Sequence, residues 1–279
     1  MVTIVKTSKM RIFLLLTFIV SLFYNCTSKR TELVLLGTVH QPIQNFTPDS
    51  LYNILVRIKP DVILFEVDSS FFNENFEFNK TWESNENIAT VKYMKNFKVD
   101  VRPYEFSGRN EYRIKIGARP TDSKATKMLD SLFNHNVLDS LHKNIYKDFI
   151  KINDSLSSFA YLGAKAFNNS NTDQIAQLRQ EFQYKKLLSI MQEYPVFSNT
   201  YHIIKEGDSI SYTDGYKRAA EFWDLRNHTM SKNILHFVRK YNGRRIVVLN
   251  GYFHRYYLNS LIKPKQDELK FTIKEYYEY

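Results

Sequence analysis

The residues in this sequence best suited to chemistry are two histidines and two carboxylates. His40 and His254 each end a Gly-x-x-His motif, and Glu66 and Glu105 each stand at the end of a short apolar run or just after one. Imidazole nitrogens and carboxylate oxygens make up the ligand sets of divalent metals such as Mn, Co, Zn and Fe. If the fold brings the four side chains together, they predict a metal site.

Glu66 stands inside the apolar run DVILFEV, residues 61–67. A carboxylate buried without a partner would cost several kcal/mol or shift its pKa, so Glu66 needs a cation or hydrogen-bond donors nearby. That cation is either a metal or an arginine in a structural ion pair. Glu105 and Asp68 are further candidates, and we expect both to be more exposed to solvent.

Apolar runs bounded by turn residues predict the strands of one sheet, and helical spacing of apolar residues predicts the helices between them. The expected strands are 32–36, 61–67, 98–104, 245–250 and 269–276, and the expected helices are 48–58, 88–97, 215–241 and 254–262. Strands that alternate with helices pair in parallel through right-handed crossovers. We therefore predict an α/β fold with a mostly parallel central sheet flanked by helices.

A helical insertion, about residues 120–200, separates the third and fourth core strands. Residues 125–194 are rich in Leu and Lys and carry no strand signal, and a break at Asn168–Asn171 is expected between two long helices. Residues 195–214 are expected to be irregular. His135 and His142, seven residues apart, would share a helix face without a nearby acid.

The expected strands also explain how distant residues could form one site. In an open parallel sheet, ligands gather outside the carboxyl ends of the strands. His40 follows the first strand, Glu66 ends the second, Glu105 follows the third and His254 follows the fourth. The remaining histidines are interpreted as surface or packing residues: His202, His228 and His236.

Residues 1–26 resemble a bacterial lipoprotein signal. A basic start precedes the apolar run 12–24, which is short for a membrane span, and Cys26 follows it directly. Lipidated Cys26 would anchor residues 27–279, expected to form one domain, to a membrane of the cell envelope after export. The alternative is a signal anchor in which the cysteine has no role.

Composition excludes several other classes of protein. The chain has 279 residues, of which 43% are hydrophobic and 24% charged, so it is neither disordered nor fibrous. Its net charge of +10 is spread along Lys-rich helices without a compact basic run, so nucleic acid is not an expected partner. Phosphate-loop, dinucleotide-binding, HExxH and GxSxG motifs do not occur.

Four segments together resemble the superfamily of TraB/PrgY, Tiki and ChaN-like proteins. They are GTVH at 37–40, KPDVILFEVD at 59–68, GYFH at 251–254, and the Arg226-Asn227 pair with Met230 before the second Gly-x-x-His motif. The resemblance covers residues 31–110 and 215–262. Because the superfamily contains metallopeptidases, pheromone-shutdown proteins, esterase-like relatives and haem-binding lipoproteins, it implies a fold more firmly than an activity.

By analogy with the Tiki branch, His40, His254 and Glu66 would act at a divalent metal, with Arg226 and Asn227 lining the site. This implies a metal-dependent hydrolase in which the ion activates water against a peptide or ester carbonyl. Glu66 would be a ligand or a base, and Arg226 would stabilise the oxyanion.

Two alternatives remain open at this point. The first is a haem- or iron-binding lipoprotein without catalysis, in which His40, His254, Tyr104 or Tyr252 would ligate iron. The second is a non-catalytic family member. Arg255 follows the second motif directly and would place a cation beside the expected metal site. This is a departure from the family pattern.

Overall fold

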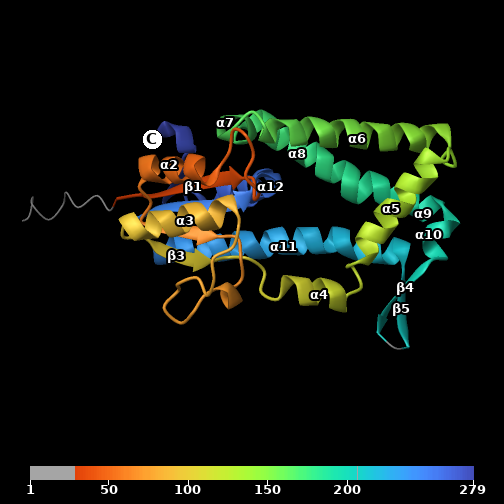
Figure 1. Cartoon of the computed structure of the whole chain (residues 1–279), viewed down its shortest axis with the longest axis horizontal. Helices are drawn as coiled ribbons and strands as arrows, with labels where there is room; N and C mark the ends of the chain where they lie inside the picture. The colour runs from red at the N-terminus through yellow and green to blue at the C-terminus, as the bar shows by residue number, and fades with distance from the viewer. Residues whose placement is uncertain (1–28, 206) are drawn as a thin grey trace, which may run out of the picture.

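A computed structural model describes residues 29–205 and 207–279. Its centre is a sheet of five parallel strands in the order β3-β2-β6-β1-β7 (Figure 1). The strands are β1 (Thr31–Thr38), β2 (Val62–Phe65), β3 (Asp100–Pro103), β6 (Arg245–Gly251) and β7 (Phe271–Ile273). The predicted α/β fold is confirmed, and the last expected strand lies at the sheet edge beside β1.

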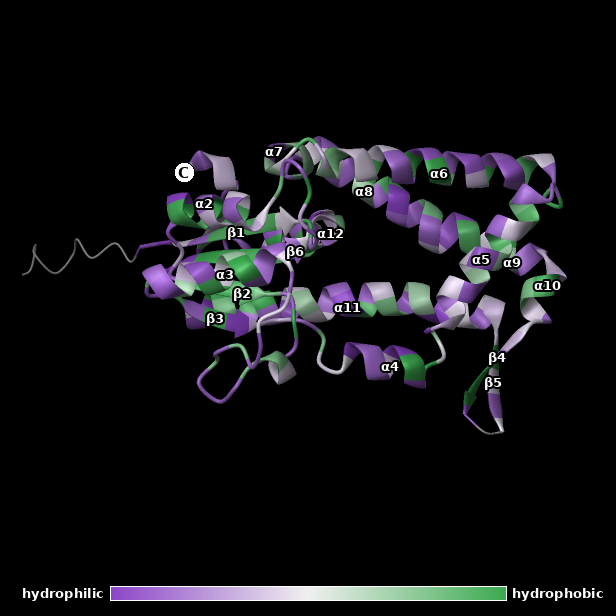
Figure 2. Cartoon of the chain, in the orientation of Figure 1, coloured by the Kyte–Doolittle hydropathy of each residue, from purple (hydrophilic) through white to green (hydrophobic). Residues whose placement is uncertain are grey.

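Helices cover both faces of the sheet. The helices of the core are α2 (Pro48–Ile58), α3 (Asn85–Asn96), α11 (Tyr212–Lys240) and α12 (Tyr252–Ile262). One apolar cluster joins α2 and α3 to alternate strand residues such as Val34 and Leu36, and a second joins α11 and α12 to the residues between them, such as Leu33 and Leu35. Apolar residues therefore concentrate on the central strands in Figure 2.

Local sequence determines the first core helix, α2, with the bounds that periodicity predicted. Thr47 caps its first turn together with Ser50, and Pro48 occupies the first helical position, where a missing N–H costs nothing. The helix ends at Lys59, whose φ of 52° lies in the left-handed region. Its apolar positions all face the core: Leu51, Ile54, Leu55 and Ile58.

The predicted insertion between the third and fourth core strands is confirmed as helical. It comprises α4 (Arg109–Lys115), α5 (Thr121–Asn134), α6 (Ser140–Ala160), α7 (Ala164–Phe167), α8 (Ser170–Glu181), a π-helical turn (Phe182–Lys186), α9 (Leu187–Glu193) and α10 (Pro195–Ser198). Figure 1 shows α6, α8 and α11 extending away from the sheet, with α5, α9 and α10 at their far end. The long amphipathic helices have a small apolar cluster of their own there.

Two details of the insertion differ from the sequence prediction. Residues 195–214 are not irregular: β4 (Tyr201–Lys205) and β5 (Asp208–Ser211) form an antiparallel hairpin before α11 begins. In β4 the apolar side chains of Tyr201 and Ile203 are exposed to solvent. Its sequence therefore does not show the apolar run or the apolar–polar alternation that indicates a buried strand. The predicted helix carrying both His135 and His142 is also wrong, because α5 ends at Asn134 and α6 begins at Ser140.

Asn168 fastens the insertion to the sheet. Its side chain is fully buried, accepts a hydrogen bond from Gly37 N at 2.7 Å and donates one to Gly37 O at 3.0 Å. The predicted break between helices at this residue is confirmed. The Asn168 side chain there also satisfies backbone groups at the end of β1 that would otherwise lack hydrogen-bond partners. Arg255 adds a second link, since it turns away from His254 to pair with Asp173 of α8 and with Glu275.

Candidate functional site

The four predicted polar positions meet at the carboxyl edge of the sheet. His40 follows β1, Glu66 follows β2, Glu105 follows β3 and His254 lies in the first turn of α12, after β6. Arg226 and Asn227 reach the same place from the middle of α11, where both are buried. The topological argument placed the four strand-end residues together, and the structure brings them together; Arg226 and Asn227, which only the resemblance placed there, lie there too.

Arg226 is the cation at the centre of this group. Its Nε donates to Glu105 Oε1 at 2.9 Å, its Nη2 donates to Glu66 Oε1 at 2.6 Å and also to Glu105, and its Nη1 donates to His254. Burial alone would lower the pKa of Arg226, but the charges of Glu66 and Glu105 outweigh it and raise that pKa. Glu66 therefore has the arginine partner that its place in an apolar run requires.

His254 is held as a neutral imidazole. Its Nδ1 lies 2.8 Å from Asn227 Oδ1, and its Nε2 lies 2.8 Å from Arg226 Nη1. An amide oxygen only accepts and a guanidinium only donates, so Nδ1 carries the proton and Nε2 is the acceptor. Burial and the charge of Arg226 hold the His254 pKa well below its ordinary value. The indole of Trp223 stacks on the ring, with centroids 4.3 Å apart.

His40 is oriented by a carboxylate that the sequence analysis missed. Its Nδ1 lies 2.8 Å from Glu86 Oε1, and the hydroxyl of Thr38 donates to the same oxygen at 2.5 Å. The hydrogen bond to Glu86 outweighs burial and raises the pKa of His40 to about 9. A carboxylate on the far nitrogen fixes the tautomer and ring orientation, which leaves Nε2 facing the site.

The two Gly-x-x-His motifs pack against each other through their glycines. A Cβ at Gly37 would come within 2.9 Å of the Tyr252 Cβ, so β1 approaches α12 this closely only because residue 37 has no side chain. A Cβ at Gly251 would lie 3.4 Å from His40 Nε2 and 3.8 Å from Glu66 Oε2. The second glycine therefore keeps open the space between one histidine and the carboxylate.

Glu66 also caps the second motif. Its Oε2 accepts a hydrogen bond from Gly251 N at 2.6 Å, at the N-terminus of α12. Its Oε1 lies 3.8 Å from His254 Nε2. Glu66 thus stands between the two motif histidines, with one oxygen toward each.

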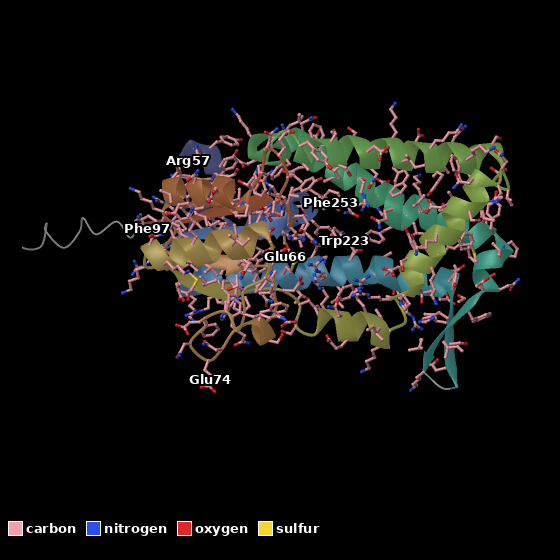
Figure 3. All side chains as sticks on the ribbon, in the orientation of Figure 1. Arg57, Glu66, Glu74, Phe97, Trp223 and Phe253 are labelled. Atoms are coloured by element: carbon pink, nitrogen blue, oxygen red, sulfur yellow. The ribbon has the colours of Figure 1, made fainter. Side chains whose placement is uncertain are left out.

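A pocket of about 210 Å³ opens beside this group. His40, Glu66 and Glu86 line its polar side, and Phe65, Trp82 and Leu249 line its apolar side. Figure 3 shows Glu66 near Trp223 and Phe253, where the sheet meets the long helices of the insertion. A mostly apolar pocket with a few convergent polar groups is the usual form of a small-molecule site.

The donor set fits a divalent metal in part. His40 Nε2 and Glu66 Oε2 flank the open space at Gly251, and both histidines have the hydrogen-bonded Nδ1 that is typical of metal ligands. Within residues 29–205 and 207–279, however, no three His, Cys, Asp or Glu side chains lie in position to hold an ion as they stand. Arg226 donates to Glu66, Glu105 and His254, so the guanidinium engages these three groups where an ion would otherwise bind them.

Other predicted candidates lie apart from the site or serve the fold. Asp68 caps a 3-10 turn (Ser69–Phe71) by accepting from Ser70 N. The hydroxyls of Tyr104 and Tyr252, proposed as iron ligands, donate to the backbone oxygens of Leu249 and Leu156. Glu105, expected to be solvated, is buried and also receives Arg109. His142 pairs with Asp139 and packs against Tyr194 at the far end of the insertion.

Glu86 and Trp223 are the residues at the site that sequence reasoning did not find. Glu86 stands in the first turn of α3, two residues before the point where the helix was expected to begin, and an acidic residue in a first turn is common. Its burial shows only in three dimensions. Trp223 lies one turn before Arg226 on α11, so the two residues share a helix face. This spacing was the only feature of the sequence that could have pointed to Trp223 as a site residue.

The predicted signal at 1–26 and lipidation at Cys26 fall outside the described residues. In the part of the chain that the structure does describe, no helix has both the length and the apolar character to cross a bilayer. Membrane anchoring through Cys26 therefore stays a prediction.

Comparison with protein-family models, with curated proteins and with solved structures finds no match to this chain. The resemblance to the TraB/PrgY, Tiki and ChaN-like superfamily therefore rests on the quoted motifs alone. What the fold and site define together is an α/β protein with a buried cluster of acid, base and guanidinium groups at the carboxyl edge of its sheet.

Proposed function

We propose that this chain is a metal-dependent hydrolase that acts on a peptide or ester carbonyl in the pocket beside His40. The observation that carries the proposal is the orientation of both histidines: each has its Nδ1 fixed by an acceptor and its Nε2 directed into the site that holds Glu66. In metal-ligating histidines the second ring nitrogen is almost always hydrogen-bonded in this way, which fixes the tautomer and presents the first nitrogen to the ion.

His40 Nε2 and Glu66 Oε2 would hold the ion, because they flank the space that Gly251 leaves open. A divalent ion there would supply Lewis acidity and lower the pKa of a water molecule. Two protein ligands suit a hard ion that keeps several waters, such as Mn, better than a tetrahedral Zn site with three or four protein ligands. His254 would join as a third ligand only if the Arg226 side chain moved from its Nε2.

The other residues would organise the site. Glu86 would keep His40 in the tautomer that presents Nε2, and Arg226 would hold the carboxylates of Glu66 and Glu105 in place through its hydrogen bonds. If Glu66 does not ligate, its carboxylate is the base that would take the proton of the attacking water. Because Nε, Nη1 and Nη2 of Arg226 all donate to protein groups, its expected role at an oxyanion would require a rearrangement.

The test is metal content and hydrolysis measured on the same preparations. Purified protein is loaded separately with Mn, Co, Zn and hemin, and bound metal is measured by elemental analysis. Hydrolysis of an ester and a peptide library is measured in parallel. We expect near-stoichiometric divalent ion and metal-dependent hydrolysis, both lost in His40→Ala and in Glu66→Gln but kept in His228→Ala, an exposed histidine.

The same experiment separates the alternatives. A Soret band after hemin loading that disappears in His40→Ala, without divalent metal, would identify a haem-binding protein instead. An intact fold with neither ion nor haem would identify a non-catalytic member and overturn the proposal. Metal binding should also strengthen as pH rises toward about 9, because the proton that His40 holds must leave before Nε2 ligates.

A further inference from the structure

A second and larger cleft, of about 610 Å³, lies between the insertion and the core. The C-terminal part of α8, the π-helical turn and the start of α9 form one wall, and α11 and α12 form the other. None of the residues that line the pocket beside His40 lines this cleft. It is therefore a separate cavity, of a size that small ligands occupy.

Aromatic side chains from both walls meet in this cleft. Tyr184 from the π-helical turn lies against Trp223 of α11, with ring centroids 5.7 Å apart and planes 31° apart. Tyr256 and Tyr257 of α12 line it from the other side. A π-helical turn is rare and often marks a functional site, and Tyr184, which contacts Trp223 of α11, lies within this one.

Neutral hydrogen-bonding groups surround these rings. Gln177 and Gln180 of α8 and Ser260 of α12 line the cleft. The indole Nε1 of Trp223 is buried near the Tyr256 hydroxyl and makes no hydrogen bond of good geometry among the described residues, which is an unusual state for a buried donor. A ligand that brings an acceptor to the indole would satisfy it.

Charges in the cleft are of both signs and nearly balance. Glu181 and Lys185 stand four residues apart on one wall, and Lys217 and Glu221 stand four residues apart on the other. The further acid, Asp224, accepts a hydrogen bond from Tyr257 at 2.9 Å. A polyanion such as a nucleic acid needs a basic groove, so the cleft favours an uncharged ligand.

We infer that this cleft binds a neutral saccharide. A sugar ring has an apolar face that packs on Tyr and Trp rings and a rim of hydroxyls that pair with amides and hydroxyls, and the cleft offers both kinds of surface. An aromatic cage for a quaternary ammonium ion would enclose a space between its rings. Here Tyr184 and Trp223 lie against each other instead, and Trp223 also stacks on His254, so these rings enclose no such space between them. This inference does not depend on the hydrolase proposal.

The chain offers a direct reporter, because Trp82 and Trp223 are its two tryptophans. Trp82→Phe leaves Trp223 as the sole fluorophore and keeps an aromatic ring against Phe65 and Phe78. The Trp82→Phe protein is titrated with maltotetraose, cellotetraose and N-acetylchitotetraose. We expect a saturable change in Trp223 emission with at least one of them. Tyr184→Ala should weaken the binding about threefold to tenfold, the value of one ring contact.

Gln177→Ala tests the site at an exposed position, where substitution should not disturb folding. We expect this variant to bind the sugar more weakly at an unchanged melting temperature, so that misfolding does not explain the loss. His40→Ala should bind the sugar unchanged, which separates this site from the hydrolase site. The inference is overturned if no sugar changes the emission at millimolar concentration, or if neither Tyr184→Ala nor Gln177→Ala weakens the binding. A saturable response to tetramethylammonium alone would also overturn it.

Discussion

Nη1 of Arg226 donates a hydrogen bond to Nε2 of His254 over 2.8 Å. The same guanidinium binds Glu66 and Glu105, so one residue of α11 connects polar groups that follow three different strands. The motif histidine of α12 is thereby kept neutral, and the two buried carboxylates share one cation.

Removing this guanidinium should be costly to the fold. Arg226→Met leaves Glu66 buried without its cation and Glu105 with Arg109 alone, and loss of one partner of a buried ion pair costs about 3 to 5 kcal/mol. Urea unfolding measures the difference. Arg239→Met, at an exposed position near the end of the same helix, is the matched control and should change the free energy of unfolding by less than about 0.5 kcal/mol. Equal losses in both variants would contradict the central role of Arg226.

Glu86 should set the charge state of His40. In Glu86→Gln the hydrogen bond and charge that raise the His40 pKa to about 9 are lost, so that pKa should fall toward its ordinary value of 6.5. NMR titration of the imidazole measures the change. Glu83→Gln, an exposed carboxylate at the rim of the same pocket, should leave the titration unchanged.

The raised pKa of His40 also predicts a dependence of stability on pH. Because the folded protein holds this proton more tightly than the unfolded chain, the contribution of His40 is fully present below about pH 6.5. It should be lost as pH rises through about 9. The difference in unfolding free energy between wild type and Glu86→Gln should therefore shrink from pH 6 to pH 10, and a constant difference would exclude the linkage.

The two motif glycines should respond differently to the same substitution. Gly37→Ala places a Cβ 2.9 Å from the Tyr252 Cβ, so we expect a large fall in melting temperature. Gly251→Ala meets His40 Nε2 at 3.4 Å, which is an ordinary contact, so the fold should survive. The added methyl fills the proposed metal position, and bound divalent ion should be lost. Full metal content in Gly251→Ala would contradict that position.

Asn168 should matter more than its neighbours in the polar segment between α7 and α8. Asn168→Ala leaves Gly37 N and Gly37 O buried without partners, at a cost of about 1 to 3 kcal/mol for each unsatisfied group. Asn171→Ala removes an exposed side chain and should be nearly neutral. Chemical denaturation of the two variants compares them, and similar stabilities would show that Asn168 does not fasten the insertion.

Glu32 should make the fold sensitive to acid. Burial alone would raise its pKa, but hydrogen bonds from Lys274 and Arg245, each 2.7 Å long, lower it from 4.5 to about 2. The stabilisation is present above about pH 4.5 and is lost as pH falls through about 2. Thermal melts of wild type and Glu32→Gln should converge over this range. Glu74→Gln, in an exposed loop (Figure 3), should follow wild type throughout.

Much of the architecture was predictable because it depends on local patterns. Buried parallel strands are continuous apolar runs, so β1, β2 and β6 were found within a few residues of their bounds. The hairpin β4–β5 was missed because it projects with exposed apolar residues and has no buried face to impose alternation along β4. The break between α5 and α6 was missed because neither flank contains Pro or Gly.

The sequence by itself determined which residues could meet, since parallel strands deliver their carboxyl ends to one edge. Only the tertiary structure decided what each of them contacts. Glu66 was predicted to need a cation, and the fold places Arg226 of α11 there, 160 residues away. Arg255 turned out to bind Asp173 and Glu275 rather than crowd His254. Such choices depend on distances between side chains far apart in sequence, which no local pattern encodes.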